Sequence, residues 1–231
     1  MPGQDFNFSF PRQPDLEPLS AEEAEQILLE KLGKAESDHL TAIWELAFFY
    51  SQTSQYPIAQ QYMERYIRTT ADPEKQAGAY LGLGQTMEKM KEYQAAISFY
   101  SQALSLGPTN TPTWYLINNN LGFCLNHFER YVDAEKYCRV AIGIDPERPN
   151  AYKNLGISLA GQGQYAEAAR NYVLATRVQA ADGRALKLLE QLFQDHSEIN
   201  REFPDILDQV EQCRQAVRMV AEFREKLEKD Q

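Results

Sequence analysis

Apolar residues recur at helical spacing along most of this chain, and small residues interrupt them at regular intervals. Four times a leucine precedes an alanine or glycine, and 12 residues after that small residue stands an alanine with a tyrosine three positions before it. The small residues are Ala47, Gly84, Gly122 and Gly156, so the steps are 37, 38 and 34 residues. A period near 34 is typical of a helix–turn–helix unit that buries its apolar face only against its neighbours. The pattern predicts an all-α protein, an α-solenoid of about four units.

Each unit is predicted to contain two antiparallel helices, with the second beginning at or just before the tyrosine. The 12-residue distance from the small residue to the alanine is constant, and all length variation falls between units, where a longer loop costs little. Glycine and alanine leave room for a facing side chain where two helices approach closely. We therefore expect the constant spacing of small residues within the chain to mark the helix crossings.

The regions outside the repeats have patterns of their own. Four prolines and the alternating Phe6, Phe8 and Phe10 predict an extended tail over residues 1–19, because proline lacks the amide donor that a helix needs. Ser20 and Glu23 have the spacing of a capping box and open a predicted N-terminal capping helix. The predicted regions are the tail at 1–19, the capping helix at 20–38, units at 40–73, 77–110, 115–148 and 149–182 within a repeat domain spanning 39–182, and C-terminal capping helices at 183–231, the first of them over residues 184–195.

The last predicted helix opens at Pro204 and carries an apolar stripe. Its members follow steps of four and three residues, broken only by Arg224 at its expected place, and are Ile206, Val210, Cys213, Val217, Val220 and Leu227. This is the seam spacing of a helix that packs along another helix. Leu207, Met219 and Phe223 widen the stripe, which favours burial against the array. Two interpretations stay open: the helix caps its own array, or residues 204–228 mediate association, either self-association or binding of a partner.

Composition and charge exclude several classes of partner. The net charge is −10, which argues against nucleic acid, whose phosphates attract clustered lysine and arginine. The sequence contains no run of 18 or more apolar residues, so no membrane insertion is predicted. The N-terminus lacks the features of a secretory signal. The three cysteines, Cys124, Cys138 and Cys213, are widely spaced and are interpreted as reduced core thiols of a cytoplasmic protein.

No group of residues in the sequence is typical of catalysis. His39, His127 and His196 are isolated from one another, and the cysteines and histidines do not combine into the Cys-x₂₋₄-Cys and His-x₃₋₅-His spacings of a zinc site. No glycine-rich phosphate-binding loop follows a predicted strand. The sequence therefore predicts no catalytic residue, no metal and no cofactor, and indicates that the chain is not an enzyme.

The repeat resembles the tetratricopeptide repeat family. That family places an aromatic residue, Leu-Gly and a bulky residue in the first helix, and alanine, an aromatic residue, alanine and proline through the second. The second unit matches at Tyr80, Leu83, Gly84, Met87, Ala96, Tyr100, Ala103 and Pro108, and the last at Tyr152, Leu155, Gly156, Leu159, Ala168, Tyr172 and Ala175. The third unit has Asn118 at the aromatic position. The resemblance covers residues 40–182 and implies a concave groove lined by the first helices.

The resemblance also implies which residues face that groove. The mapped positions that we take as candidate peptide- or partner-binding residues are Trp44, Phe48, Leu81, Gln85, Asn119, Asn120, Phe123, Asn150, Lys153, Asn154 and Ile157. Family members that clamp a carboxylate have lysine and arginine where this chain has mostly leucine, glutamine and asparagine, so that clamp is not expected. Asparagine side chains recur along the predicted groove, and each can both donate and accept hydrogen bonds. This ladder of amides predicts contacts to a peptide backbone. The alternative is that the asparagines only solvate a helix and the apolar members pack on neighbouring helices.

The sequence therefore favours a non-enzymatic protein–protein interaction module. It would act as a scaffold, adaptor or assembly factor that holds a peptide or a partner helix in a largely neutral groove. The alternative is an accessory or regulatory subunit of a larger complex that uses its convex face or its C-terminal helix. A solenoid presents an extended concave surface and also a convex face and free ends. The pattern alone therefore leaves both functions open.

Overall fold

The computed structural model describes residues 20–34, 36–201 and 203–229. The phenylalanine- and proline-rich tail predicted over residues 1–19 lies outside the described residues. Helices follow one another through the described chain, in the order α1 (Ala21–Lys34), α2 (Glu36–Gln52), α3 (Tyr56–Thr69), α4 (Pro73–Lys89), α5 (Tyr93–Ser105), α6 (Thr111–His127), α7 (Tyr131–Ile144), α8 (Pro149–Gly161), α9 (Tyr165–Val178), α10 (Arg184–Asp195), the 3₁₀ helix η1 (Ser197–Arg201) and α11 (Ile206–Lys229). The described residues contain no strand. The predicted all-α solenoid is confirmed.

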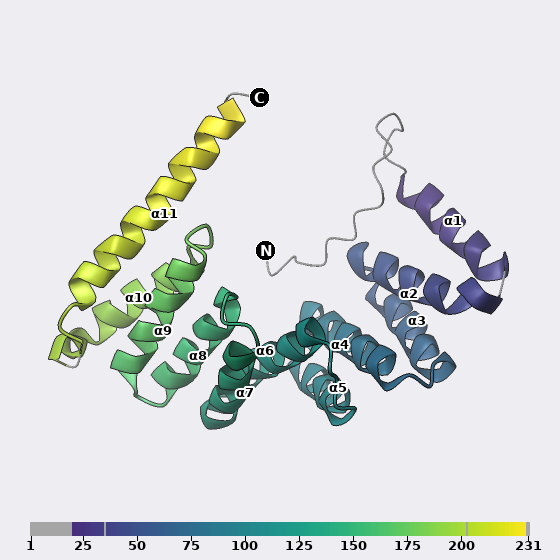
Figure 1. Ribbon diagram of the computed structural model, residues 1–231, viewed down its shortest axis with the longest axis horizontal. Coiled ribbons are helices and arrows are strands. Elements are labelled where there is room, and N and C mark those ends of the chain that lie inside the picture. The colour runs from purple at the N-terminus through teal and green to yellow at the C-terminus, as the bar shows by residue number, and fades with distance from the viewer. Residues whose placement is uncertain (1–19, 35, 202, 230–231) are drawn as a thin grey trace.

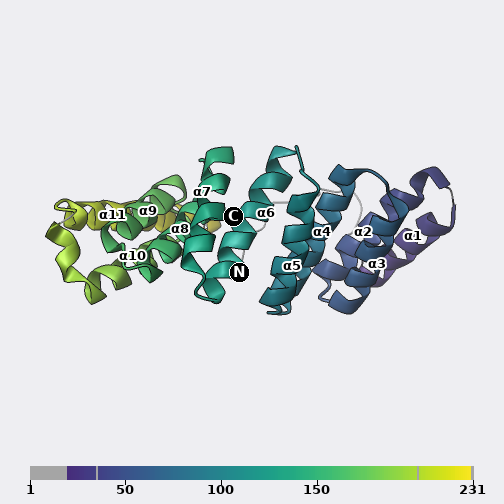
Figure 2. The same ribbon diagram turned by 90° about the horizontal axis from the view of Figure 1, so that it is seen from below.

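Antiparallel helix pairs follow each other along a curved array. The pairs are α2 with α3, α4 with α5, α6 with α7 and α8 with α9. In Figure 1 the first helices α4 and α6 lie on the concave side of the curved array, while α5 and α7 lie along its outer edge. Figure 2 shows the same pairs side by side along the longest axis. The first helices therefore line the concave side of the array.

Local capping explains where the first helices begin. The Asp72 carboxylate accepts hydrogen bonds from the backbone N–H groups of Glu74 (2.9 Å) and Lys75 (3.5 Å) at the start of α4. The Asn110 side chain accepts one from the Thr113 N–H (3.1 Å) at the start of α6. Both satisfy donors that the helix itself leaves unpaired. Helices α4 and α6 thus begin four residues before the predicted units at 77 and 115. The difference arises because the predicted unit boundaries are counted from the Leu-Gly pair and not from the capping residues.

The turn inside each repeat has the same backbone geometry. A residue with positive φ stands two positions before each tyrosine that opens a second helix, and these residues are Ser54 (62°), Lys91 (65°), Glu129 (56°) and Gly163 (77°). The next residue donates its N–H to a carbonyl five positions earlier, as from Gln164 to Leu159 (2.9 Å) and from Glu92 to Met87 (2.8 Å). This is the helix-ending motif that a left-handed residue closes. It explains why every second helix begins at its tyrosine, as the spacing predicts.

The helix crossings depend on close contact at the glycines. A Cβ atom added to Gly84 would lie 2.3 Å from Cε1 of Tyr100, and one added to Gly156 would lie 2.4 Å from Cε1 of Tyr172. In the third repeat the equivalent contact is from Gly122 to Sγ of Cys138, at 2.4 Å. The facing side chain therefore comes 16 residues after the glycine, one helical turn beyond the alanine that the 12-residue spacing singles out.

Both ends of the array are covered by further helices. At the N-terminal end, Leu28 of α1 is buried in a cluster with Leu46 and Tyr50 of α2. The Ser20–Glu23 capping box forms, with the Ser20 N–H donating to the Glu23 carboxylate at 2.9 Å. At the C-terminal end, the first half of α11 packs on α9 and α10, and its buried residues are Ile206, Val210 and Cys213. The 3₁₀ helix between α10 and α11 was not predicted.

Candidate functional site

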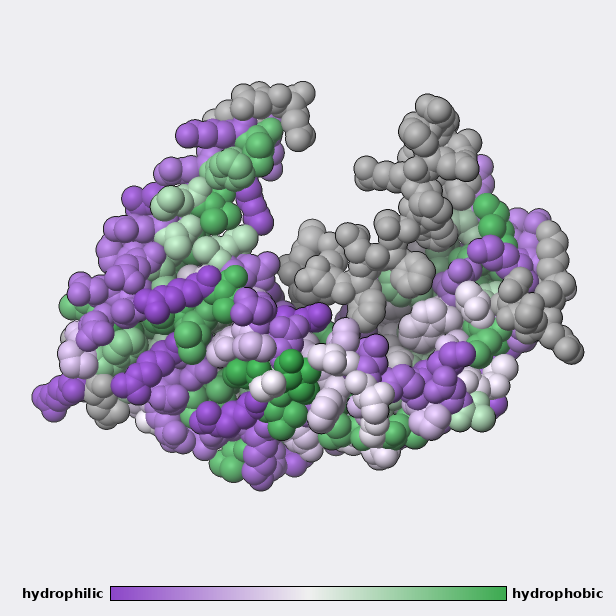
Figure 3. All heavy atoms as spheres, in the orientation of Figure 1, coloured by the Kyte–Doolittle hydropathy of each residue, from purple (hydrophilic) through white to green (hydrophobic). Residues whose placement is uncertain are grey.

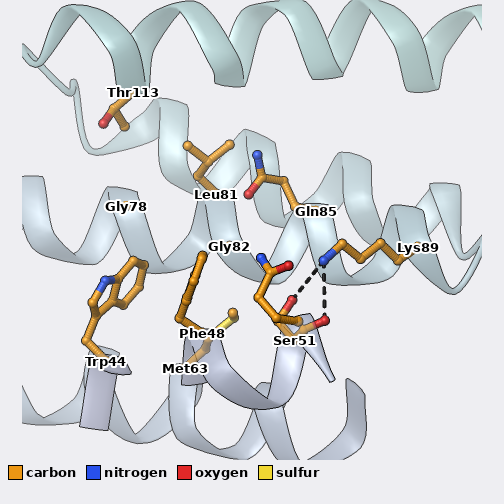
Figure 4. Close-up of a pocket in the computed structure, with 11 residues that line it drawn as sticks. Trp44, Phe48, Ser51, Met63, Gly78, Leu81, Gly82, Gln85, Lys89 and Thr113 are labelled. Atoms are coloured by element: carbon orange, nitrogen blue, oxygen red, sulfur yellow. Dashed lines mark hydrogen bonds between the residues drawn. The ribbon is translucent and has the colours of Figure 1, made fainter. Parts of the chain in front are cut away.

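A pocket of about 180 Å³ opens between the first helices of the first two repeats. Figure 4 shows it with α2 on one side and α4 on the other. Its lining residues are Trp44, Phe48, Ser51 and Gln52 of α2, Met63 of α3, Gly78, Leu81, Gly82, Gln85 and Lys89 of α4, and Thr113 of α6. Four candidate residues, Trp44, Phe48, Leu81 and Gln85, are thus brought together in one place. Most of this surface is apolar, as expected of a pocket that takes a large side chain.

Two glycines one turn apart make the space in this pocket. A Cβ atom added to Gly78 would have no neighbour within 4 Å, and one added to Gly82 would lie 3.2 Å from Sδ and Cε of Met63. Glycine inside a helix costs roughly 1 kcal/mol relative to alanine. The Gly-x-x-x-Gly spacing at groove positions is the sequence signal for this pocket, and our list of candidate binding residues omitted both glycines.

The walls of the pocket are held by contacts to the repeat core. The rings of Trp44 and Tyr66 lie 5.2 Å apart between centroids, and Leu81 is only 5% exposed. At one end, Nζ of Lys89 donates to Oγ (3.2 Å) and the carbonyl oxygen (3.4 Å) of Ser51, as drawn in Figure 4. The pocket therefore combines a preformed apolar interior with a polar rim that carries one positive charge.

The asparagines lie further along the array and largely bind one another. Nδ2 of Asn154 donates to Oδ1 of Asn119 at 3.0 Å, and Nδ2 of Asn119 donates to Oδ1 of Asn120 at 3.0 Å. Asn119 and Asn154 are 7% and 3% exposed. These two amides link α6 to α8 within the protein, which revises the expectation of an amide ladder open to a peptide along its whole length. Asn120 is less deeply buried and continues the chain of hydrogen bonds to the Tyr100 hydroxyl (3.2 Å).

This chain of hydrogen bonds ends on a carboxyl group inside the second and third repeats. The Tyr100 hydroxyl donates to Oε1 of Glu88, and the Cys124 thiol lies 3.6 Å from the same oxygen. Burial raises the pKa of Glu88 to about 7, although the two donors act in the opposite direction. Burial and the nearby Glu88 carboxyl raise the pKa of Tyr100 well above its usual value. The network is a structural connection between repeats with a titratable group at its end.

The remaining candidate residues do not share the pocket. Phe123 packs on Tyr93, with centroids 6.0 Å apart, and on His127 at 4.8 Å. Nζ of Lys153 donates to Oδ1 of Asn150 at 3.1 Å, and burial lowers the pKa of Lys153 to about 8. Ile157 packs on the core of the fourth repeat and the C-terminal cap.

No other chemical site emerges from the described residues. They bring together no group of three or more His, Cys, Asp and Glu side chains that could hold a metal ion. Cys124, Cys138 and Cys213 are all buried with free thiols, as predicted for core residues. No helix in this part of the chain has the length and hydropathy needed to cross a bilayer.

Comparison with known families decides how the repeats are classified. A family model described as tetratricopeptide repeat matches residues 77–110, which contain most of α4 and all of α5. Residues 77–110 are thus similar to a tetratricopeptide repeat. The matched residues coincide with the second predicted unit. Tetratricopeptide-repeat proteins are in general non-enzymatic protein–protein interaction modules, and their solenoids present extended concave surfaces.

Solved structures and a curated relative agree with this tetratricopeptide-repeat fold. The structure of YrrB, described as having an unusual peptide-binding site, is 20% identical, with a TM-score of 0.61 over 88% of this chain and 100% of that one. A MamA structure is 22% identical, with a TM-score of 0.57 over 69% of this chain and 88% of that one. The peroxisomal targeting signal receptor of Eremothecium gossypii is 27% identical over 58% of this chain, but the match spans only 23% of that receptor.

Proposed function

We propose that the chain is a non-enzymatic interaction module that holds a segment of a partner protein at the pocket between α2 and α4. The observation that carries this proposal is a preformed apolar pocket in which two helix glycines, Gly78 and Gly82, leave room. The segment is an extended peptide or a helix that inserts one large apolar or aromatic side chain. Burying such a side chain stabilises a complex by about 1.5–3 kcal/mol.

The polar rim supports a peptide more than a small apolar molecule. Gln52, Gln85 and Thr113 surround the apolar interior and offer donors and acceptors to a peptide backbone. The segment would continue along the concave side of the array toward Asn120 and Phe123, which are only partly buried. Candidate residues further along, Asn150, Lys153 and Ile157, would meet the end of a longer segment. Asn119 and Asn154 would then support this surface from below.

The comparisons are consistent with such a role. YrrB, whose fold this chain shares, is described as carrying a peptide-binding site. The match to the peroxisomal targeting signal receptor covers less than a quarter of that protein, so its ligand is not assigned to this chain. The partner is defined here by its chemistry alone: a segment with a large apolar anchor and an accessible backbone.

Filling the pocket should weaken binding while leaving the fold intact. The change is Gly78→Phe, because a side chain at Gly78 meets no neighbouring atom and projects into the pocket. Peptides selected from a random library on the full chain should carry an aromatic or large aliphatic anchor. Their affinity for Gly78→Phe should fall at least about tenfold, since the anchor loses its burial. Isothermal titration calorimetry measures this loss.

A matched substitution separates pocket filling from a general effect of a bulky residue. Gly143 of α7 is exposed, and a Cβ added there also has no neighbour within 4 Å. Gly143→Phe should therefore retain the affinity of the parent chain, and thermal melts should show both variants folded. Selected peptides that bind Gly78→Phe as tightly as the parent chain would contradict the proposed site.

Binding at this pocket should depend only weakly on salt. Lys89 is the one charged residue among the side chains that line it within the described structure, and it already contacts Ser51. Salt screens charged contacts much more than apolar ones. Raising the salt concentration from about 0.05 M to about 0.5 M should change the affinity of a selected peptide by less than about threefold. A steep loss of affinity would instead indicate recognition through charge.

A further inference from the structure

The helix α11 (Ile206–Lys229) is divided into a packed half and an exposed half. Its first part is held in the core by Ile206, Val210 and Cys213, which are at most 4% exposed. Its second part leaves Met219, Phe223 and Leu227 exposed by 70%, 63% and 49%. Figure 1 shows this half extending beyond α9 and α10. The two interpretations of this helix, a cap in cis and an association surface, therefore apply to different halves of it.

The exposed half carries a continuous apolar stripe. Met219, Phe223 and Leu227 follow one another at intervals of four residues, so they lie on one face of the helix. Figure 3 shows apolar side chains along this half of α11. A shallow hollow beside the stripe is lined by Met219, Val220, Glu222, Phe223 and Lys226. Contiguous apolar surface of this kind marks a site of association.

The charges beside the stripe indicate what covers it. Glu222 and Lys226 lie on the same side of the stripe at the same hollow, and neither forms an ion pair within the described residues. An acidic and a basic residue on one flank are complementary to the same flank of a second α11 that runs in the opposite direction. The surface is therefore self-complementary, as a two-fold interface requires.

We propose that the exposed half of α11 binds the same helix of a second copy of this chain, antiparallel, about a two-fold axis at Phe223. This pairing sets Met219 of one copy against Leu227 of the other, since both stand four residues from the axis. It also brings Glu222 within two residues along the helix, about 3 Å, of Lys226 in the second copy. Each contact occurs twice, and the seam has the form of a short antiparallel coiled coil.

The mass of the full chain in solution tests the proposal directly. Analytical ultracentrifugation of the parent protein should give a mass of two chains that falls to one chain on dilution. Phe223→Asp places a carboxylate on the axis and should give one chain at all concentrations. Val132→Asp of α7, where the side chain is 58% exposed, is the matched control and should keep the mass of two chains. A parent protein with the mass of one chain throughout would overturn the proposal and leave the stripe to a different protein.

Charge reversal tests the flank independently of the apolar seam. Glu222→Lys alone sets lysine against Lys226 of the second copy and should weaken dimerisation at least about tenfold. The double variant Glu222→Lys/Lys226→Glu restores the opposite charges and should recover most of this loss. Equal dimerisation of the single and double variants would contradict the assigned flank.

Cross-linking tests the direction of the helices. The native thiols Cys124, Cys138 and Cys213 are buried, so added surface cysteines dominate disulfide formation. Met219→Cys mixed with Leu227→Cys should give the disulfide-linked pair, whereas either variant alone should not. Efficient linkage of Met219→Cys to itself would show a parallel pair and overturn the model. The Gly78→Phe variant should keep the mass of two chains, so failure of the peptide site and failure of the dimer are distinguishable.

Discussion

Gly156→Leu should destabilise the chain by about 3 kcal/mol or more, at or above the top of the usual range for an overpacked core. A Cβ at this position already lies 2.4 Å from Cε1 of Tyr172, and Tyr172 is only 3% exposed within the C-terminal core cluster. The leucine would force α8 and α9 apart, because neither the ring nor the backbone has free space to move into. Denaturation by urea, followed by circular dichroism, measures this loss.

A glycine elsewhere in the array provides the control. Gly143→Leu puts the same side chain on α7, where an added Cβ meets no atom within 4 Å. It should be neutral or slightly stabilising, by up to about 1 kcal/mol, because leucine favours the helix more than glycine does. A Gly156→Leu variant that unfolds at the same urea concentration as the parent chain would show that the helix crossing is wrongly placed.

The first repeat suggests a second substitution that would compensate for a larger residue at the Gly156 helix crossing. Ala47 occupies the position of the glycine there, and the residue 16 positions later is Met63, with both buried in one cluster. Methionine is flexible enough to leave room for the extra methyl group. Gly156→Ala combined with Tyr172→Met should therefore be less destabilised than the sum of the two single changes, and a double-mutant cycle measures the difference.

The repeat architecture could be predicted from sequence because its signals are local. The leucine, small residue and tyrosine recur at constant spacing, and each tyrosine does open a second helix. The helix Arg184–Asp195 was predicted with the bounds that the structure gives. The contact from Gly156 to Tyr172 was not predicted, because a repeat period gives the spacing of positions and not which side chains meet across two helices.

The candidate site was predictable only in part, for a related reason. Groove positions follow from the repeat, and Trp44 and Leu81 do meet in one pocket. The role of Asn119 and Asn154 could not be predicted, because an asparagine in the pattern looks the same whether its amide faces solvent or another asparagine. Their mutual hydrogen bond depends on the rotation between successive repeats, which no single repeat encodes.

The stability of the chain should fall as the pH rises from about 4.5 to about 7, because of Glu88. Its pKa is about 7 in the folded chain, where burial disfavours the charged form, and 4.5 is the ordinary value. Between these values the folded state holds a proton that the unfolded state has lost, so rising pH favours unfolding. Above about pH 7 both states are ionised and this contribution to the pH dependence levels off. A shift of this size corresponds to at most about 3 kcal/mol.

Glu88→Gln should remove this pH dependence. The amide introduced by the substitution keeps an oxygen that can accept from the Tyr100 hydroxyl and the Cys124 thiol, but it carries no charge that burial can disfavour. The variant should match the parent chain near pH 4.5 and exceed its free energy of unfolding by up to about 3 kcal/mol at about pH 8. Urea titrations across this range measure the difference, with the exposed Glu147→Gln as the control for loss of one charge. A constant difference between Glu88→Gln and the parent chain at all pH values would show that folding does not raise the pKa of Glu88.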